Sequence, residues 1–189
     1  MNLIAFIDTE IEPKTGMILD IGSVRNDGSS FHKSSVAEFI QFLNGTEFIC
    51  GHNIFNHDIK YIGKALTDAG IDAINIIDTL FLSPLLFPTK LYHALLKDDK
   101  LQSEDTNNPL NDSIKAKDLF YDEITAFKET DETLKQILYL LLNKEKEFRS
   151  FFHFIGYKSE NREPEKLIRE KFENEICEQV ELSKIMDMN

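Results

Sequence analysis

An apolar run near the start of the chain, followed at once by two acids, constrains the fold more than any other feature. Residues 3–7 are all apolar, which is typical of a buried strand, and we expect a strand over residues 3–8. Asp8 and Glu10 follow, with Thr9 between them. Residues two apart in a strand point to one face, so the two carboxylates are predicted to project side by side. Exposed acids at a strand end are the common alternative.

Two adjacent carboxylates favour the binding of a cation. At neutral pH they repel each other, and the pKa of one rises unless a cation lies between them. Hard divalent ions such as Mg²⁺ and Mn²⁺ prefer oxygen ligands of this kind. The position of Asp8 and Glu10 directly after so apolar a run strengthens the case for a metal site, while exposed strand-end acids stay the alternative.

The remaining sequence alternates segments with the patterns of strands and of helices. Further strands are predicted at residues 17–25, 29–32, 47–50 and 73–77. Helices are predicted at residues 35–43, 56–69, 78–87, 91–101, 112–127 and 133–155. The expected N-caps include Ser35, Asn56 and Asp112. The turn Asn26-Asp27-Gly28 joins the second and third strands into a hairpin. Antiparallel strands followed by alternating helices and strands predict an α/β fold with a mixed sheet covered on both faces.

The length and charge of the chain limit its function. Its 189 residues suit one compact domain with a short appendage, and 42% apolar residues suffice for a core. Acids outnumber bases by 33 to 21, which gives a net charge of −12. This balance excludes a protein that grips nucleic acid through a broad basic surface. It allows an enzyme that holds a phosphate through metal ions, with a partner domain supplying affinity for nucleic acid.

The C-terminal composition and the cysteines bear on domain organisation and location. We expect a domain over residues 1–157 and, over residues 158–189, a charged helical extension or a linker to a further domain. Cys50 and Cys177 lie far apart with no CxxC pair, so neither a zinc cluster nor a disulfide framework is indicated. A reducing cytoplasm is expected. No signal peptide is evident, and the longest apolar run, residues 137–142, is too short to cross a membrane.

Two more acids stand where helices are predicted to begin. Asp58 closes the segment GHNIFNHD, directly after a predicted strand, and Asp112 opens the segment DSIKAKDLF. Both have common structural roles, because an acid in the first turn interacts favourably with the helix dipole and aspartate is a frequent N-cap. His52 and His57 are five residues apart, outside the i,i+4 spacing of a helical metal pair, so a zinc site is only weakly indicated.

In their order along the chain, these motifs resemble those of the DnaQ-like (DEDD, RNase T-type) 3′–5′ exonuclease family. FIDTE is similar to the family's first motif, GHNIFNHDIKYI to the second and NDSIKAKDLF to the third, while ILDIGSVR and IIDTLFLSPLLFP resemble the segments between them. The resemblance covers residues 3–120. It implies a ribonuclease-H-like fold, in which a mixed five-stranded sheet is flanked by helices. It also implies that the catalytic, metal-binding carboxylates are Asp8, Glu10, Asp58 and Asp112.

The resemblance implies an activity as well as a fold. The family hydrolyses phosphodiester bonds with two divalent ions, so Mg²⁺ or Mn²⁺ and the 3′ end of single-stranded DNA are the expected cofactors and substrate. Asp8 would bridge both ions, and Thr9 and Asn53 would contact the substrate. More narrowly, LSPLLFP, YHALLKDDKLQ and NNPLNDSIKAKDLFYDE resemble the exonuclease-type N-terminal domain of some long RecQ-family DNA helicases. That likeness implies a covalently linked helicase and a role in DNA repair.

The sequence departs from the family at the general base. One branch places a histidine five residues before the last acid and another places a tyrosine four residues before it; here these positions are Asn107 and Asn108. An amide does not accept a proton at pH 7, and a positioned base contributes roughly 10²–10⁴ in rate. His93, five residues before Asp98, offers a shifted third motif or a substitute base, and His57 is another substitute. The alternative is a weak or inactive exonuclease-fold module that binds DNA ends or a partner.

Overall fold

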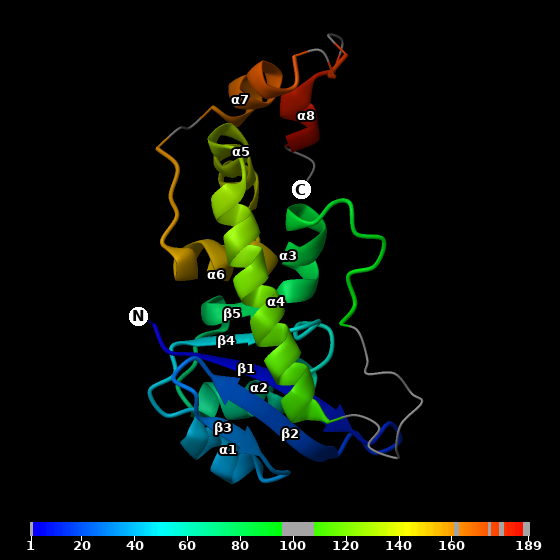
Figure 1. The fold of residues 1–189 in the computed structure, drawn as a ribbon, viewed down its shortest axis with the longest axis vertical. Helices are drawn as coiled ribbons and strands as arrows, with labels where there is room; N and C mark the ends of the chain where they lie inside the picture. Colours follow the sequence, from blue (N-terminus) through cyan, green and yellow to red (C-terminus); the bar gives the residue numbers. More distant parts are fainter. Residues whose placement is uncertain (1, 96–107, 161–162, 174, 178–179, 187–189) are drawn as a thin grey trace. The chain divides into compact units, whose positions relative to one another are not determined.

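The computed structural model describes residues 2–95, 108–160, 163–173, 175–177 and 180–186 (Figure 1). The chain divides into two compact units, residues 1–126 and 127–189. The division falls within the helix α4 (Pro109–Glu129). Among the helices of the described ranges, none is both long and apolar enough to cross a membrane. The expected functional domain over residues 1–157 stays a prediction.

A mixed five-stranded sheet forms the centre of the first unit (Figure 1). Its strands are β1 (Ile4–Ile11), β2 (Ile18–Arg25), β3 (Ser30–His32), β4 (Phe48–Gly51) and β5 (Ile76–Asp78). Their order is β3-β2-β1-β4-β5, with antiparallel pairs among the first three and parallel pairs from β1 through β4 to β5. The predicted α/β fold with a mixed sheet flanked by helices is confirmed, and it is consistent with a ribonuclease-H-like fold.

Helices connect and cover these strands. Those of the first unit are α1 (Val36–Phe42), α2 (Ile59–Asp68), α3 (Thr79–Leu86) and most of α4, with a 3-10 helix η1 (Ala73–Asn75). The hydroxyl of Ser35 accepts a hydrogen bond from the backbone N–H of Glu38, so the predicted cap of α1 is confirmed. Asp78 caps α3 in the same way, by accepting a bond from the N–H of Leu80.

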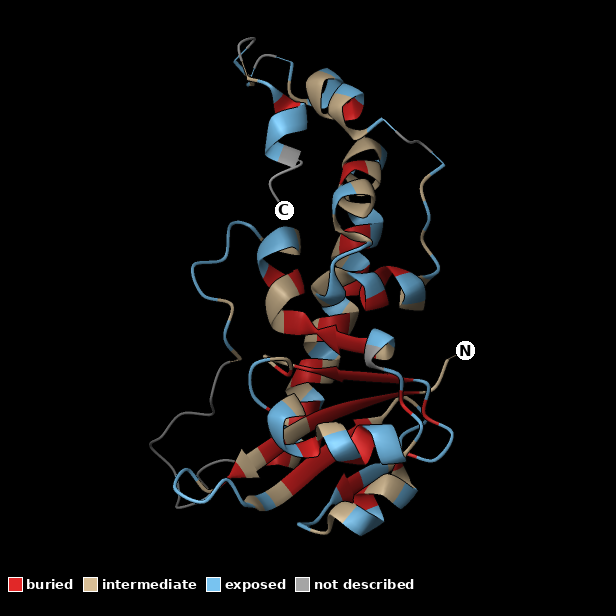
Figure 2. Ribbon diagram, turned by 180° about the vertical axis from the view of Figure 1, so that it is seen from behind, coloured by how far each residue is buried: buried red, intermediate tan, exposed pale blue. Residues whose placement is uncertain are grey.

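Alternation along β1 divides the core into two layers. Ala5 and Ile7 belong to a buried cluster with Phe39 of α1 and residues of α2. Phe6 lies on the other face, where its ring centroid is 5.7 Å from that of Phe120 in α4. Figure 2 shows the buried residues concentrated along the central strands. The sheet is therefore covered on both faces, by α1 and α2 on one side and by α4 on the other.

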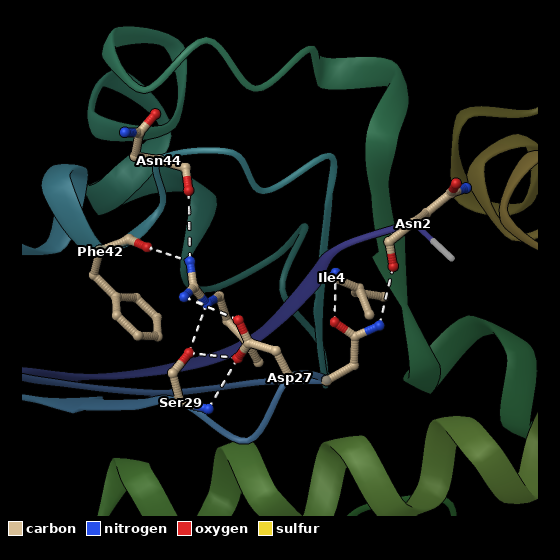
Figure 3. A network of polar contacts seen from close by, with 8 residues as sticks. Asn2, Ile4, Asp27, Ser29, Phe42 and Asn44 are labelled. Carbon is tan, nitrogen blue, oxygen red and sulfur yellow. Dashed lines mark hydrogen bonds and ion pairs between the residues drawn. The ribbon is translucent and has the colours of Figure 1, made fainter.

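Side chains at the turn between β2 and β3 hold the hairpin against its neighbours (Figure 3). The guanidinium of Arg25 donates to the hydroxyl of Ser29 at 2.7 Å and to the backbone carbonyl of Phe42 at 3.0 Å. The amide oxygen of Asn26 accepts a bond from the backbone N–H of Ile4 at 3.2 Å. The predicted hairpin is thus tied to the end of α1 and to the start of β1.

The first strand is longer than its apolar run predicted. It continues to Ile11, because ladder pairs of Thr9 with Ile21 and of Glu10 with Asp20 extend it. The acids therefore lie within a paired strand, and the backbone of a paired strand is held more firmly than that of a loop.

Other predicted segments also need correction. The strand expected over residues 73–77 is the 3-10 helix η1 followed by β5. Residues 91–95 are not helical, and residues 96–101, the rest of that predicted helix, lie outside the described residues. The single helix expected over residues 133–155 is two helices, because the chain turns at residues 143–145.

The second unit is helical where it is described. Its helices after α4 are α5 (Glu132–Leu142), α6 (Lys146–Ile155), α7 (Pro164–Lys171) and α8 (Leu182–Met186). An aromatic cluster packs inside it: the ring of Phe127 lies 5.4 Å from that of Phe151 and 5.2 Å from that of Tyr157. Gly156 ends α6 with a φ of 66°, a left-handed conformation that glycine adopts without strain.

One buried acid stands out in the first unit. Glu123 of α4 is fully buried, and neither of its carboxylate oxygens has a hydrogen-bond partner among the residues that the structure describes. Burial is the main cause that raises the pKa of Glu123 to about 9; the nearby charge of Asp78 acts in the same direction and Lys90 in the opposite one. At neutral pH the folded protein therefore holds this carboxyl in its protonated form.

The raised pKa of Glu123 predicts a fall in stability with rising pH. Above its ordinary pKa of 4.5 the unfolded chain releases this proton, while the folded chain keeps it up to about pH 9. The unfolded state then binds fewer protons, so the free energy of unfolding falls by up to about 1.4 kcal/mol per pH unit in this window. Glu123→Gln should remove this contribution, leaving a flatter profile in urea denaturation between pH 5 and 8. Identical slopes for the variant and the wild type would contradict the assignment.

Candidate functional site

The first two predicted acids come from the middle of β1. Asp8 and Glu10 lie on the same face as Phe6, the face that α4 covers. Asp8 is paired with Gly22 of β2, and the ladder becomes irregular only after Glu10. The predicted side-by-side placement of the two carboxylates follows from this register.

Asp58 is positioned by the loop between β4 and α2. It directly precedes α2, so Asn56 is not the cap that the sequence predicted. The loop turns at Asn53, whose φ of 64° is left-handed, a conformation that asparagine tolerates better than most residues. The buried carboxylate of Asp58, only 1% exposed, accepts a hydrogen bond from the hydroxyl of Thr9 at 2.7 Å. This bond ties the loop to β1.

Asp78, at the end of β5, accepts hydrogen bonds from the same loop, a role that the sequence did not reveal. Its two carboxylate oxygens accept hydrogen bonds from the backbone N–H groups of Asn53 at 2.8 Å and of Phe55 at 3.2 Å. Burial raises the pKa of Asp78, while these bonds lower it. The partners of Asp78 lie some 25 residues earlier in the chain, so no local spacing indicates the contact. The one signal in the sequence is the position of an acid at the end of a predicted strand.

Asp112 reaches the site through the first turn of α4. The helix begins at Pro109, and the side chain of Asn108 accepts a hydrogen bond from the N–H of Leu110, so Asp112 is not the cap that was predicted. A Cβ atom at Gly22 would lie 2.0 Å from the backbone N of Leu110 and 2.0 Å from the carbonyl carbon of Pro109. The missing side chain at Gly22 therefore lets α4 approach the strand that pairs with Asp8.

The four acids line one cavity of about 380 Å³. Thr9 and Asn53, the predicted substrate contacts, also line it, as does His57. Its described walls are completed by Ile11, His52, Ala94 and Leu95. The structure thus brings together Asp8, Glu10, Asp58 and Asp112, which lie up to about a hundred residues apart in the chain.

The electrostatics of the cavity follow from its acids. Burial, together with the charges of Asp58 and Asp112, raises the pKa of Asp8 to about 8, while His57 acts in the opposite direction. The contact with the Asp58 carboxylate, whose Oδ1 lies 3.7 Å from the His57 Nδ1, raises the pKa of His57. Negative charge thus accumulates around Asp8, and a cation would relieve it.

The four carboxylates supply the oxygen ligands that hard divalent ions prefer, although their side chains are not arranged around a common point. Within the described ranges, no three His, Cys, Asp or Glu side chains are arranged to hold one ion. The carboxylates have partners of their own: Asp58 accepts from Thr9, and the Asp112 Oδ1 lies 3.3 Å from the Lys115 Nζ. Four carboxylates on one cavity nevertheless match the preference of Mg²⁺ and Mn²⁺ for oxygen. Binding an ion would require these acids to exchange their present partners for it.

The residues considered as general base lie in different parts of the first unit or outside the described residues. Asn107 lies outside the described residues. His93 lines a neighbouring cavity, where its Nδ1 is 2.8 Å from the hydroxyl of Ser83. His57 lines the acidic cavity itself. His52 also lines it, but burial lowers the pKa of His52 to about 4, and its Nδ1 is bonded to the hydroxyl of Thr79.

No protein-family model, curated protein or solved structure matches the chain. The cavity, its acids and their order in the sequence are therefore the basis for assigning a function.

Gly22→Ala should disrupt the site by displacing the backbone of α4 at Pro109 and Leu110. Because the added methyl would overlap with the first turn of α4, we expect the free energy of unfolding to fall by about 1–3 kcal/mol or more. The matched control is Gly63→Ala, since a Cβ there meets nothing closer than Ile59 at 3.6 Å. Alanine inside a helix should stabilise α2 by about 0.5–1 kcal/mol. Urea denaturation measures both changes, and equal stability of the two variants would contradict the packing of α4 against Gly22.

Proposed function

We propose that this chain is a metal-dependent 3′–5′ exonuclease of the DnaQ-like type that hydrolyses phosphodiester bonds of DNA. One observation carries the proposal: the four acids that the motifs single out, in the family's order, line a single cavity. Two lie on β1, one precedes α2 and one lies in the first turn of α4. Since a local structural role for each acid would not require them to meet, their meeting favours a shared role.

The carboxylates have distinct places in the proposed reaction. When bound, two Mg²⁺ or Mn²⁺ ions supply an activated water and a counter-charge for the leaving 3′ oxygen. Asp8, which lines the cavity together with the other three acids, would contribute to holding both ions. Glu10 and Asp58 would each hold one ion, and Asp112 would complete the set. Thr9 keeps Asp58 in place by its hydrogen bond.

The substrate proposal follows from the walls of the cavity and from the charge of the chain. Thr9 and Asn53 line the cavity together with the acids, so they are the residues proposed to contact the terminal nucleotide. A chain with a net charge of −12 repels nucleic acid as a whole, so affinity must come from local positive charge, to which bound cations would add, or from a partner. A covalently linked helicase of the RecQ type, acting in DNA repair in the cytoplasm, is the partner that the sequence motifs favour.

His57 is the residue best placed to act as the general base. It lines the acidic cavity, whereas the side chain of His93 is hydrogen-bonded to Ser83 in the neighbouring one. The base would accept a proton from the attacking water, and the family position for this role is occupied by Asn107.

A second candidate function is a module with the exonuclease fold but little or no turnover. The observation in its favour concerns the base position of the tyrosine branch, which here is Asn108. Its side chain caps α4 by accepting hydrogen bonds from the N–H groups of Leu110 at 3.0 Å and of Asn111 at 3.3 Å. This position thus has a structural role, and the module would bind DNA ends or a partner domain.

The nuclease proposal predicts Mn²⁺-dependent release of nucleotides from 5′-labelled single-stranded DNA, which gel electrophoresis would measure. The double variant Asp8→Ala/Glu10→Ala should reduce release to the level seen with a chelator, because it removes the central ligands. Mn²⁺ should also raise the melting temperature of the wild type and not of the double variant.

A surface acid provides the control for this experiment. Asp68, paired with Lys64 on the exposed side of α2, lies outside the cavity, so Asp68→Ala should retain activity. Unaltered release by the double variant would reject the site. Binding of DNA ends without release in Mg²⁺ or Mn²⁺, with turnover restored by Asn107→His, would favour the second candidate.

The choice of base predicts different effects of two histidine variants. His57→Gln should lower kcat by about 10²–10⁴, the usual contribution of a positioned base. His93→Gln should lower kcat much less, because its ring lies in the neighbouring cavity. Single-turnover rates at saturating DNA measure both, and a larger loss for His93→Gln would assign the base to His93.

A further inference from the structure

A second cavity with the opposite charge adjoins the acidic one. Its volume is about 310 Å³, and its walls include Lys90, Tyr92 and Lys115. Ala94 and Leu95 line both cavities, so the two are neighbours within the first unit. In a chain with a net charge of −12, two lysines on the wall of one cavity are a local concentration of positive charge beside the cluster of acids.

The two lysines are held in different ways. The Lys90 Nζ lies 3.9 Å above the centre of the Phe87 ring, a cation–π contact, and its backbone N–H donates to the carbonyl of Phe87 at 3.0 Å. The Lys115 Nζ lies 3.3 Å from the Asp112 Oδ1, so this lysine joins the wall of the basic cavity to an acid of the other. Both ammonium groups are thus directed by neighbouring residues of the same unit.

An exposed aromatic side chain completes the surface. Tyr92 is 84% exposed and Leu91 is 89% exposed, which is unusual for two adjacent large side chains. Tyr92 also lines the basic cavity, two residues from Lys90. An aromatic ring beside cationic groups is the combination with which proteins bind single-stranded nucleic acid, since bases stack on the ring while phosphates meet the charge.

We propose that the basic cavity binds a backbone phosphate of the strand whose 3′ end occupies the acidic cavity. Lys90 and Lys115 supply the positive charge, and Tyr92 stacks on a base next to that phosphate. The inference rests on the proposed function for the identity of the strand. It also solves a physical problem of that function: acids that gather metal ions repel the incoming polyanion, and adjacent cations offset this repulsion.

Binding can be measured apart from hydrolysis in the full-length double variant Asp8→Ala/Glu10→Ala, with a chelator present. The probe is a 5′-labelled oligodeoxythymidylate, followed by fluorescence anisotropy at several salt concentrations. In this background Lys90→Ala should weaken binding about tenfold and reduce the slope of log K against log salt by about 0.7, the value for one phosphate contact on a single strand. Tyr92→Ala should weaken binding about tenfold with the slope unchanged.

Matched variants separate charge from packing. Lys90→Arg keeps the charge and should retain most of the affinity, whereas Lys90→Ala should not. Lys64 belongs to the same unit but lines neither cavity, so Lys64→Ala is the control and should change neither affinity nor slope. Equal binding by the Lys90→Ala and Lys64→Ala variants would overturn the proposal, as would the absence of oligonucleotide binding in the double variant.

Two further outcomes distinguish the sources of phosphate and the two proposals. Displacement of the oligonucleotide by an equal concentration of thymidine monophosphate would overturn a strand-phosphate site and indicate a nucleotide pocket. If the wild type releases no nucleotides with Mn²⁺ and Lys90→Ala still weakens binding, the phosphate site stands and the nuclease proposal fails. If the wild type releases nucleotides normally and Lys90→Ala changes neither KM nor binding, the nuclease proposal stands and the phosphate site fails.

Discussion

The close approach of two backbones at Gly22 is the contact on which the arrangement of the site depends. The first turn of α4 packs where a side chain on β2 would otherwise stand, with Pro109 and Leu110 against the strand. Gly22 also pairs with Asp8 across the ladder. Asp112, in this same first turn of α4, is therefore placed in the cavity that Asp8 also lines. A helix held farther from the sheet would still cover Phe6, but it would leave the fourth acid outside the cavity.

Bringing these acids together costs stability, and the core around them offsets that cost. The raised pKa of Asp8 records the unfavourable free energy of placing a carboxylate in a partly buried cavity among others of its charge. On the same face of the sheet, Phe6 packs against Phe120 and Tyr121 of α4 at 5.7 and 6.0 Å. Such conflict between local electrostatics and packing is typical of functional sites, where residues serve a ligand instead of the fold.

The sheet and the grouping of the four acids could be predicted from the sequence. The ends of the strands and helices, and the contacts that position the acids, could not. The apolar run up to Ile7 located β1, yet its end at Ile11 depends on ladder pairs with β2, which no local pattern encodes. Pro109 is a residue typical of a first helical turn and could have signalled the start of α4. The bonds from Asp78 to the loop at Asn53 join residues far apart in the chain, so spacing alone could not reveal them.

The net charge of this chain is a poor guide to what its cavities bind, because binding depends on the local distribution of charge. A value of −12 argues against nucleic-acid binding by the whole surface, and it says nothing about a pocket that gathers two lysines. The ion pair between Lys115 and Asp112 lies between the two cavities. A cation bound by Asp112 in the acidic cavity would compete with Lys115 for this carboxylate, and a phosphate bound by Lys115 would compete with Asp112 for this ammonium group. Metal binding in one cavity and strand binding in the other would then favour each other, since each would remove a competing partner of the other.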